Sequence, residues 1–177
     1  MSDAPETVVI GLGNVILSDD GLGAHSLRRL RDRYPPADRI ELIEGGTAGL
    51  LLLPHLADAR RAIIIDAIDT GAPPGTLVRL PGEDWASTYT IRITPHDIGL
   101  RDLLAAARLS GAWPQELVLH GAQPDSTAIG TQLSAPLAAA LDPLVHAILA
   151  SLAAWDATAS QAAPPPATNT ISRPACA

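Results

Sequence analysis

Three residues with metal-binding side chains stand at the ends of apolar segments in this sequence. Asp20 lies in GLGNVILSDDGLGA, after the apolar run TVVI; Asp66 lies in IIIDAID, and His96 lies in ITPHDIGL. Two carboxylates and one imidazole can bind divalent nickel, zinc or manganese and leave coordination positions for water or substrate. The sequence therefore predicts an open cation site, provided that the fold brings Asp20, Asp66 and His96 together.

The glycine-rich loop around Asp20 also allows two other interpretations. Gly11 and Gly13 fit the start of a dinucleotide-binding turn, but Ile16 occupies the third glycine position, and the chain contains no lysine for a P-loop. Helix capping is the second alternative, because Asp19 and Asp20 can accept hydrogen bonds from free N–H groups and complement the helix dipole. One of the two acids can cap the helix while the other binds a cation.

Asp66 and His96 are candidate ligands for different physical reasons. A carboxylate at the end of a buried strand is costly unless it is paired, hydrogen-bonded or bound to a cation, so a purely structural role for Asp66 is the alternative. His96 opens a helix, where the dipole disfavours imidazolium and favours the neutral, metal-binding ring. Two second candidates are Asp19, beside Asp20, and His120, at the end of the apolar run ELVLHGA.

The elements that must position these residues alternate along the chain. Short apolar runs predict strands over residues 7–12, 39–43, 61–68, 76–80 and 116–122. Helical patterns occupy residues 20–33, 48–59 (bent or ended near Pro54), 96–111 and 133–155. Such alternation predicts an α/β fold with three layers, a mainly parallel sheet with helices on both faces. Functional residues then lie at the carboxyl ends of the strands.

Composition limits the classes of protein and partner. The chain has 177 residues, 47% of them hydrophobic, and a formal charge of -7. An acidic surface without clustered cations argues against nucleic acid as a partner. One cysteine, Cys176, excludes an internal disulfide, and no uninterrupted apolar run is long enough to span a membrane. We expect a cytoplasmic protein with no membrane partner, a single domain over residues 1–155 and a disordered Pro/Ala-rich tail over residues 156–177.

The motifs GLGNVILSDDGLGA, IEGGTAG, IIIDAID and TPHDIGL, in this order, resemble those of the [NiFe]-hydrogenase maturation endopeptidases. The resemblance covers about residues 8–155 and implies a twisted five-stranded sheet flanked by helices. It implies removal of a C-terminal extension from the hydrogenase large-subunit precursor after nickel insertion. It places the metal and catalytic site on Asp20, Asp66 and His96, with nickel supplied by the precursor. A substrate-binding segment falls on Glu44, Gly45, Gly46 and Thr47.

Two other functions are compatible with parts of the sequence. A non-catalytic, nickel-dependent checkpoint or chaperone would bind the precursor without cutting it. A peptidyl-tRNA-hydrolase-like enzyme also begins with a strand and a GLGN-like turn, but it needs a basic surface for RNA, which this acidic sequence does not indicate.

Overall fold

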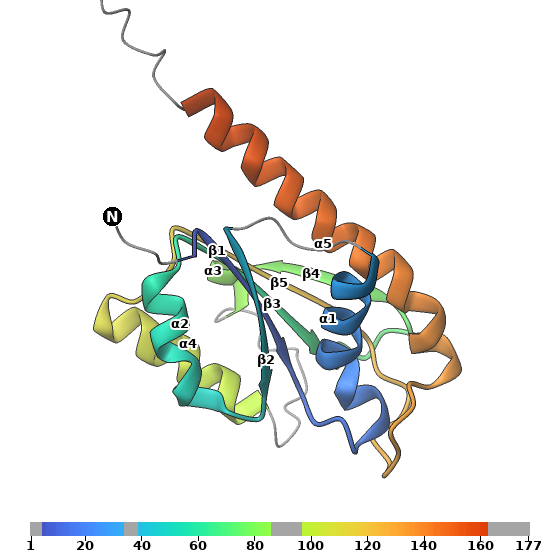
Figure 1. Cartoon of the computed structure of the whole chain (residues 1–177). Coiled ribbons are helices and arrows are strands. Elements are labelled where there is room, and N and C mark those ends of the chain that lie inside the picture. The colour runs from blue at the N-terminus through green and yellow to red at the C-terminus, as the bar shows by residue number, and fades with distance from the viewer. Residues whose placement is uncertain (1–4, 34–38, 86–96, 163–177) are drawn as a thin grey trace, which may run out of the picture.

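A computed structural model describes residues 5–33, 39–85 and 97–162 of the chain. Its centre is a twisted five-stranded sheet in the order β2-β1-β3-β5-β4 (Figure 1). The strands are β1 (Thr7–Leu12), β2 (Ile40–Gly46), β3 (Arg61–Ala67), β4 (Leu77–Pro81) and β5 (Glu116–Ala122). β1, β2, β3 and β5 run parallel, and only β4 pairs antiparallel, with β5. The predicted mainly parallel α/β sheet is confirmed.

Helices cover both faces of this sheet. They are η1 (Ser18–Gly21), α1 (Leu22–Arg33), η2 (Gly49–Leu52), α2 (Leu53–Asp58), α3 (Gly82–Trp85), α4 (Asp97–Ser110) and α5 (Ala135–Ala162). Alternate residues of β1 and β3 face opposite ways, so that Ile10 and Ile64 pack with α2 and α4, whereas Val9 and Ile63 pack with α1 and α5. Burial on both faces explains why the central strands are continuously apolar.

Two local predictions differ from the structure. Pro54 neither bends nor ends a helix; it lies in the first turn of α2, where its missing N–H needs no partner. The turn predicted at the glycines after residue 43 is the end of β2, which continues through Gly46. A bulge makes this possible, because Gly11 pairs with Glu44 and Leu12 with Gly46, leaving Gly45 as the extra residue.

The last helix is longer than predicted and runs through the start of the expected tail. α5 continues past Trp155 to Ala162, because the small residues there do not interrupt a helix and proline first recurs at residue 164. The remainder of the predicted tail lies outside the described residues. In Figure 1 the end of α5 projects beyond the sheet.

α5 is also apolar enough to be considered as a candidate membrane-spanning helix. Its stretch Ala135–Asp156 passes the length and composition test for a membrane-spanning helix, with a mean hydropathy of 1.7. Its large apolar side chains, however, face the sheet, with Leu144 and Ile148 fully buried, while its exposed positions carry mainly alanine. The large apolar side chains of α5 thus pack against the sheet, and one such helix is weak evidence for a membrane span.

Candidate active site

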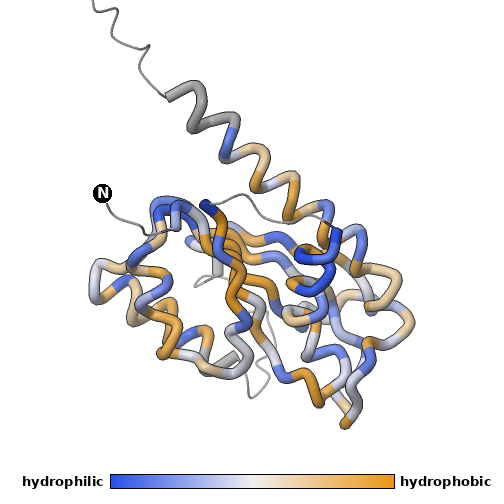
Figure 2. The backbone as a smooth tube through the Cα atoms, viewed as in Figure 1, coloured by the Kyte–Doolittle hydropathy of each residue, from blue (hydrophilic) through white to orange (hydrophobic). Residues whose placement is uncertain are grey.

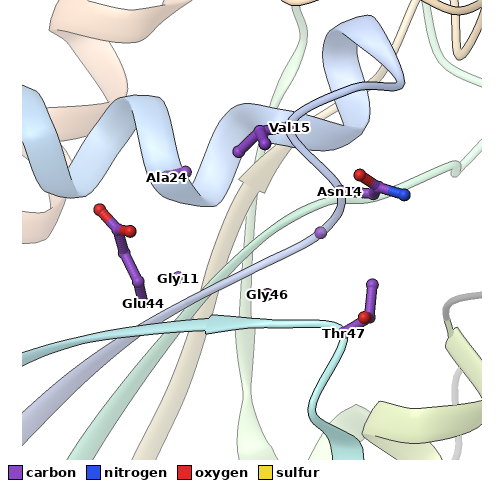
Figure 3. A pocket seen from close by; sticks show the side chains of 8 residues that line it. Gly11, Asn14, Val15, Ala24, Glu44, Gly46 and Thr47 are labelled. Atoms are coloured by element: carbon purple, nitrogen blue, oxygen red, sulfur yellow. The ribbon is translucent and has the colours of Figure 1, made fainter.

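A pocket of about 290 Å³ lies at the carboxyl ends of β1 and β2 (Figure 3). The loop after β1 forms one wall, and the end of β2 with the following turn forms another. The lining residues are Gly11, Gly13, Asn14, Val15, Ala24, Glu44, Gly46 and Thr47. The pocket is therefore at the edge of the sheet where the sequence predicted the functional residues.

Asp20 adjoins this pocket without lining it. Its side chain is 3% exposed, and its Oδ2 accepts a hydrogen bond from the backbone N–H of Asn14 over 2.7 Å. Asn14 lines the pocket, so one peptide unit separates the Asp20 carboxylate from the cavity. The backbone donor holds this carboxylate at a defined position, as a metal ligand or a catalytic group requires.

Asp66 occupies the carboxyl end of β3, one residue before the strand ends. It is 5% exposed, and its Oδ1 accepts the N–H of Ala67 over 2.8 Å. Alternation along β3 turns Asp66 to the same face as Ile64, which is the face covered by α2 and α4. The short helix η1, which carries Asp20, contacts β3. The structure thus brings the elements of Asp20 and Asp66 together.

The third predicted ligand, His96, lies outside the described residues. It directly precedes α4, which packs on the same face of the sheet that Asp66 faces. Within the described part of the chain, no group of three histidine, cysteine, aspartate or glutamate residues could hold a metal ion. Asp20 and Asp66 do supply oxygen donors of the kind that a divalent cation accepts, so a metal site there needs a further ligand.

Asp19 has a structural role in place of the ligand role considered from the sequence. Its buried carboxylate accepts three backbone N–H groups: those of Asp125 and Ser126 at 2.9 Å and that of Ser134 at 2.7 Å. Burial raises the pKa of Asp19, but the backbone donors outweigh this effect and the pKa is lowered. The Asp19 side chain makes no capping hydrogen bond within η1. Its hydrogen bonds join the loop after β1 to the loop that leads into α5.

His120 is placed away from the pocket and from Asp66. It is 1% exposed on the face of the sheet covered by α1 and α5, opposite to Asp66, and its Nε2 lies 2.9 Å from the Ser151 hydroxyl of α5. Burial, together with the nearby Arg79 guanidinium, lowers the pKa of His120 to about 4. A position at the end of a strand was the only reason to consider His120, and the face it occupies makes it a core residue.

The predicted substrate-binding segment divides into residues that line the pocket and one that does not. Glu44, Gly46 and Thr47 line the cavity, and Glu44 also forms an ion pair with Arg31 of α1 over 3.0 Å. Gly45 faces the core instead, because a Cβ added there would lie 2.9 Å from side-chain atoms of Ile10 and Leu12. Gly45 is therefore a packing residue of the bulge.

Residues 24–151 match the family model HycI, described as hydrogenase maturation protease. This match covers well over half of the chain. The chain belongs to the hydrogenase maturation protease family. The resemblance seen in the four motifs is thereby confirmed, and the protein is an endopeptidase, a peptide-bond hydrolase.

Individual relatives of this protease agree with that assignment. The Hydrogenase 2 maturation protease of Escherichia coli K12 is 36% identical over 146 residues, 82% of this chain and 89% of the relative. The hydrogenase expression/formation protein HoxM of Azotobacter vinelandii is 36% identical over 173 residues, 92% of this chain and 83% of the relative. The solved structure of the hydrogenase maturating endopeptidase HybD from E. coli superposes with a TM-score of 0.78 at 36% identity, covering 83% of this chain and 91% of that one.

Two residues near the protease's candidate site had not been singled out from the sequence. Asn14 both lines the pocket and supplies the N–H that holds Asp20; its only signal was its place in the loop after β1. Gln123 is buried beside the loop after β3, where its Oε1 accepts the N–H of Thr70 and its Nε2 donates to Asp69. Gln123 therefore supports the chain that immediately follows Asp66, and no pattern in the sequence indicates this contact.

Gly13→Ala is expected to disrupt the loop that holds Asp20. Gly13 has φ +102°, and a Cβ there would lie 1.7 Å from the Asp20 carbonyl oxygen. Strain and overpacking together should lower the free energy of unfolding by about 2–5 kcal/mol, measured by urea denaturation. Gly71→Ala is the matched control, because Gly71 also has positive φ but nothing within 4 Å, and it should lose only about 1–2 kcal/mol. Equal losses in both variants would contradict the predicted clash.

The His120 ring is expected to stay neutral well below the ordinary histidine range. An NMR titration of the ring should show a midpoint near pH 4, assigned by its absence in His120→Gln. Because the folded-state pKa is below the unfolded value of about 6.5, the unfolded state binds the proton more readily, and stability should fall as pH decreases from about 6.5 to 4. His120→Gln should remove this part of the pH dependence. A midpoint near 6.5 would show that water reaches the ring.

Proposed function

We propose that this protease removes a C-terminal extension from the precursor of a [NiFe]-hydrogenase large subunit after nickel has been inserted. Nickel held by the precursor is recognised through Asp20, Asp66 and His96, and the segment to be cut lies in the pocket beside Asp20. The observation that carries this proposal is the nearly buried Asp20 carboxylate beside the pocket, on a short helix that contacts β3, the strand of the nearly buried Asp66.

The chemistry of these side chains supports a role with a cation. Carboxylate oxygens are donors that bind divalent cations. Asp20 and Asp66 are 3% and 5% exposed, at the edge of the sheet where substrates reach parallel α/β folds. Two carboxylates and the neutral imidazole of His96 suit divalent nickel, which leaves positions for the precursor's own ligands. Cleavage then depends on correct metal insertion.

Hydrolysis requires water to add to the scissile carbonyl carbon and the C–N bond to break, with a proton passing to the leaving amine. A carboxylate within hydrogen-bond reach of that water accepts its proton and returns it to the amine. Asp66 and Asp20 are the groups proposed for this role, because their side chains are held by backbone N–H groups of Ala67 and Asn14. A metal bound nearby polarises the carbonyl oxygen or lowers the pKa of water.

The experiment that tests this function uses a purified nickel-loaded large-subunit precursor. Incubation with the protease should release the C-terminal peptide, detected by mass spectrometry of both products. The same precursor prepared without nickel should stay intact. A His96→Ala protease should leave the loaded precursor uncut. Cleavage of the nickel-free precursor at the same rate would contradict nickel-dependent recognition, and normal cleavage by His96→Ala would remove His96 from the site.

A cytoplasmic location is also part of this proposal. The single cysteine, Cys176, leaves no internal disulfide that an oxidising compartment would maintain. Fractionation of cells that express the tagged protease should find it with soluble cytoplasmic markers. Recovery with the membrane fraction would contradict the proposal. The two other functions considered from the sequence, a non-catalytic checkpoint and a tRNA hydrolase, are not favoured by any observed feature of the site.

A further inference from the structure

Large apolar side chains on the surface are concentrated around the candidate active site. Seven are exposed in the described part of the chain. Five of them lie in the segments that follow β1, β2 and β5; we call these five the apolar rim: Val15, Ile16, Leu50, Leu51 and Ile129. The hydrophobic tips of the loops after β1 and β5 are visible in Figure 2. Leu109, in contrast, is in the last turn of α4, before the connection to the amino end of β5.

Backbone contacts hold part of this rim in place. The carbonyl of Ile16 accepts the N–H of Gly130 over 3.0 Å, and the N–H of Ser18 donates to the carbonyl of Gly130 over 2.8 Å. The Ser18 hydroxyl also donates to the carbonyl of Ala128. Ile16 and Ile129 therefore belong to two loops that are joined to each other, although Ile129 is 91% exposed. Such a platform presents apolar side chains without the entropy cost of ordering a loose loop.

The rim is continuous with the pocket on two sides. Val15 and Thr47 face the cavity from opposite sides in Figure 3. Ile16 follows Val15 directly, and Leu50 and Leu51 follow Thr47 in η2. An extended segment lying in a 290 Å³ pocket covers the walls but not both sides of the rim. An occupant that covers both sides is wider than the pocket, as the surface of a folded protein is.

We propose that the apolar rim is the docking surface for the folded body of the protein substrate, which presents a complementary apolar patch around the segment to be cut. This inference rests on the proposed function, because the substrate in question is the hydrogenase large-subunit precursor. Exposed apolar groups surrounding a binding site are typical of protein–protein interfaces. The rim adds affinity for the precursor, and Asp20, Asp66 and His96 act on the segment in the pocket.

Two other occupants fit the surface less well. A second copy of the chain seated on the rim would cover the mouth of the pocket and exclude the substrate. A membrane surface requires cations beside the apolar groups to bind anionic lipid. The chain has a formal charge of -7 and no lysine; Glu44 lines the pocket with Val15, and the N–H of Asp125 donates to Asp19 in the loop after β1.

The test compares two rim substitutions with a matched control outside the rim. The Ile16→Asp/Ile129→Asp double variant removes apolar contact at two exposed positions, and Leu109→Asp introduces one aspartate at an apolar residue that is 90% exposed. Binding of the full-length precursor is measured by biolayer interferometry, and its processing is measured over a range of precursor concentrations. The double variant should weaken binding and raise KM about tenfold with little change in kcat. Leu109→Asp should match the wild type, and circular dichroism should show that all proteins are folded.

Each outcome separates the docking proposal from the proposed function. If the wild type cuts the precursor and the double variant binds and cuts it equally well, the docking proposal is overturned and the proposed function stands. If the wild type binds the precursor without cutting it and the double variant loses binding, the rim is supported and the proposed function fails. Failure of the wild type to bind overturns the rim. The wild type is also tested for dimerisation by light scattering and for flotation with phosphatidylglycerol vesicles. If the wild type shows either behaviour, and the double variant loses it but still binds the precursor normally, the docking proposal is overturned.

Discussion

Asp20→Asn is expected to slow processing of the nickel-loaded precursor at least about 100-fold, because ligands contribute more than the outer groups that orient them. The amide oxygen of asparagine can still accept the N–H of Asn14, so the loop after β1 keeps its hydrogen bond. What the variant loses is the carboxylate charge that we propose faces nickel. The measurement is a single-turnover assay of C-terminal peptide release, with a thermal melt to show that the variant is folded.

The same change at Asp66 should have a similar effect, since asparagine there can also accept the N–H of Ala67. Asp142→Asn provides the matched control. Asp142 pairs with Arg29 and Arg33 on the surface, 45% exposed, and its loss should leave processing unchanged. Processing at the normal rate by Asp20→Asn would remove Asp20 from the site and leave its carboxylate only a role in holding the loop.

Asp19→Asn is expected to cost stability, in contrast to its neighbour. The carboxylate of Asp19 accepts three backbone N–H groups with two oxygens, and asparagine must turn its NH₂ group toward at least one of these donors. An unsatisfied buried donor and the loss of charge-assisted bonds should lower the free energy of unfolding by about 2–5 kcal/mol. The corresponding fall in melting temperature is about 5–15 °C for a chain of this length.

Acid should distinguish the wild type from this variant. The folded-state pKa of Asp19 is lowered, so its contribution to stability is fully present above the unfolded value of about 3.9 and is lost as pH falls through the folded value. Asp19→Asn should therefore show a flatter loss of stability below about pH 4. Asp142→Asn should cost less than about 1 kcal/mol at neutral pH, as surface pairs usually do. An unchanged free energy of unfolding in Asp19→Asn would mean that water replaces the three hydrogen bonds.

Patterns in the sequence were sufficient to predict the sheet and the edge at which the site lies. β1, β3 and β5 are continuous apolar runs because their side chains are buried on both faces, and such runs can be recognised without tertiary information. Gly111 follows α4 with φ +76°, the left-handed conformation in which glycine commonly ends a helix. Once the strands are parallel, the residues that follow them meet at one edge. The motifs around Asp20 and Asp66 could therefore be placed before the structure was known.

The division of roles between adjacent acids could not be predicted. Asp19 and Asp20 have the same side chain and the same local setting, but the donors to Asp19 lie more than a hundred residues away in the sequence. The path of the loop after β5 decides which of the two carboxylates accepts its backbone N–H groups and so stabilises the fold. Gly45 is similar, because a bulge set by the pairing of β2 with β1 turns it into the core and away from the pocket.

Local patterns are enough to predict the order of strands and helices along the chain, the family, and the polar residues at the carboxyl edge. Contacts between distant segments settle which face of the sheet each of those residues occupies. Asp66 and His120 both lie near the ends of apolar strands. Because side chains alternate between the two faces of a sheet, Asp66 lies on the face covered by α4 and His120 on the face covered by α5, next to Ser151. The reason is physical: hydrophobic periodicity is a local property of the chain, whereas hydrogen-bond partners and covered faces depend on contacts between distant segments.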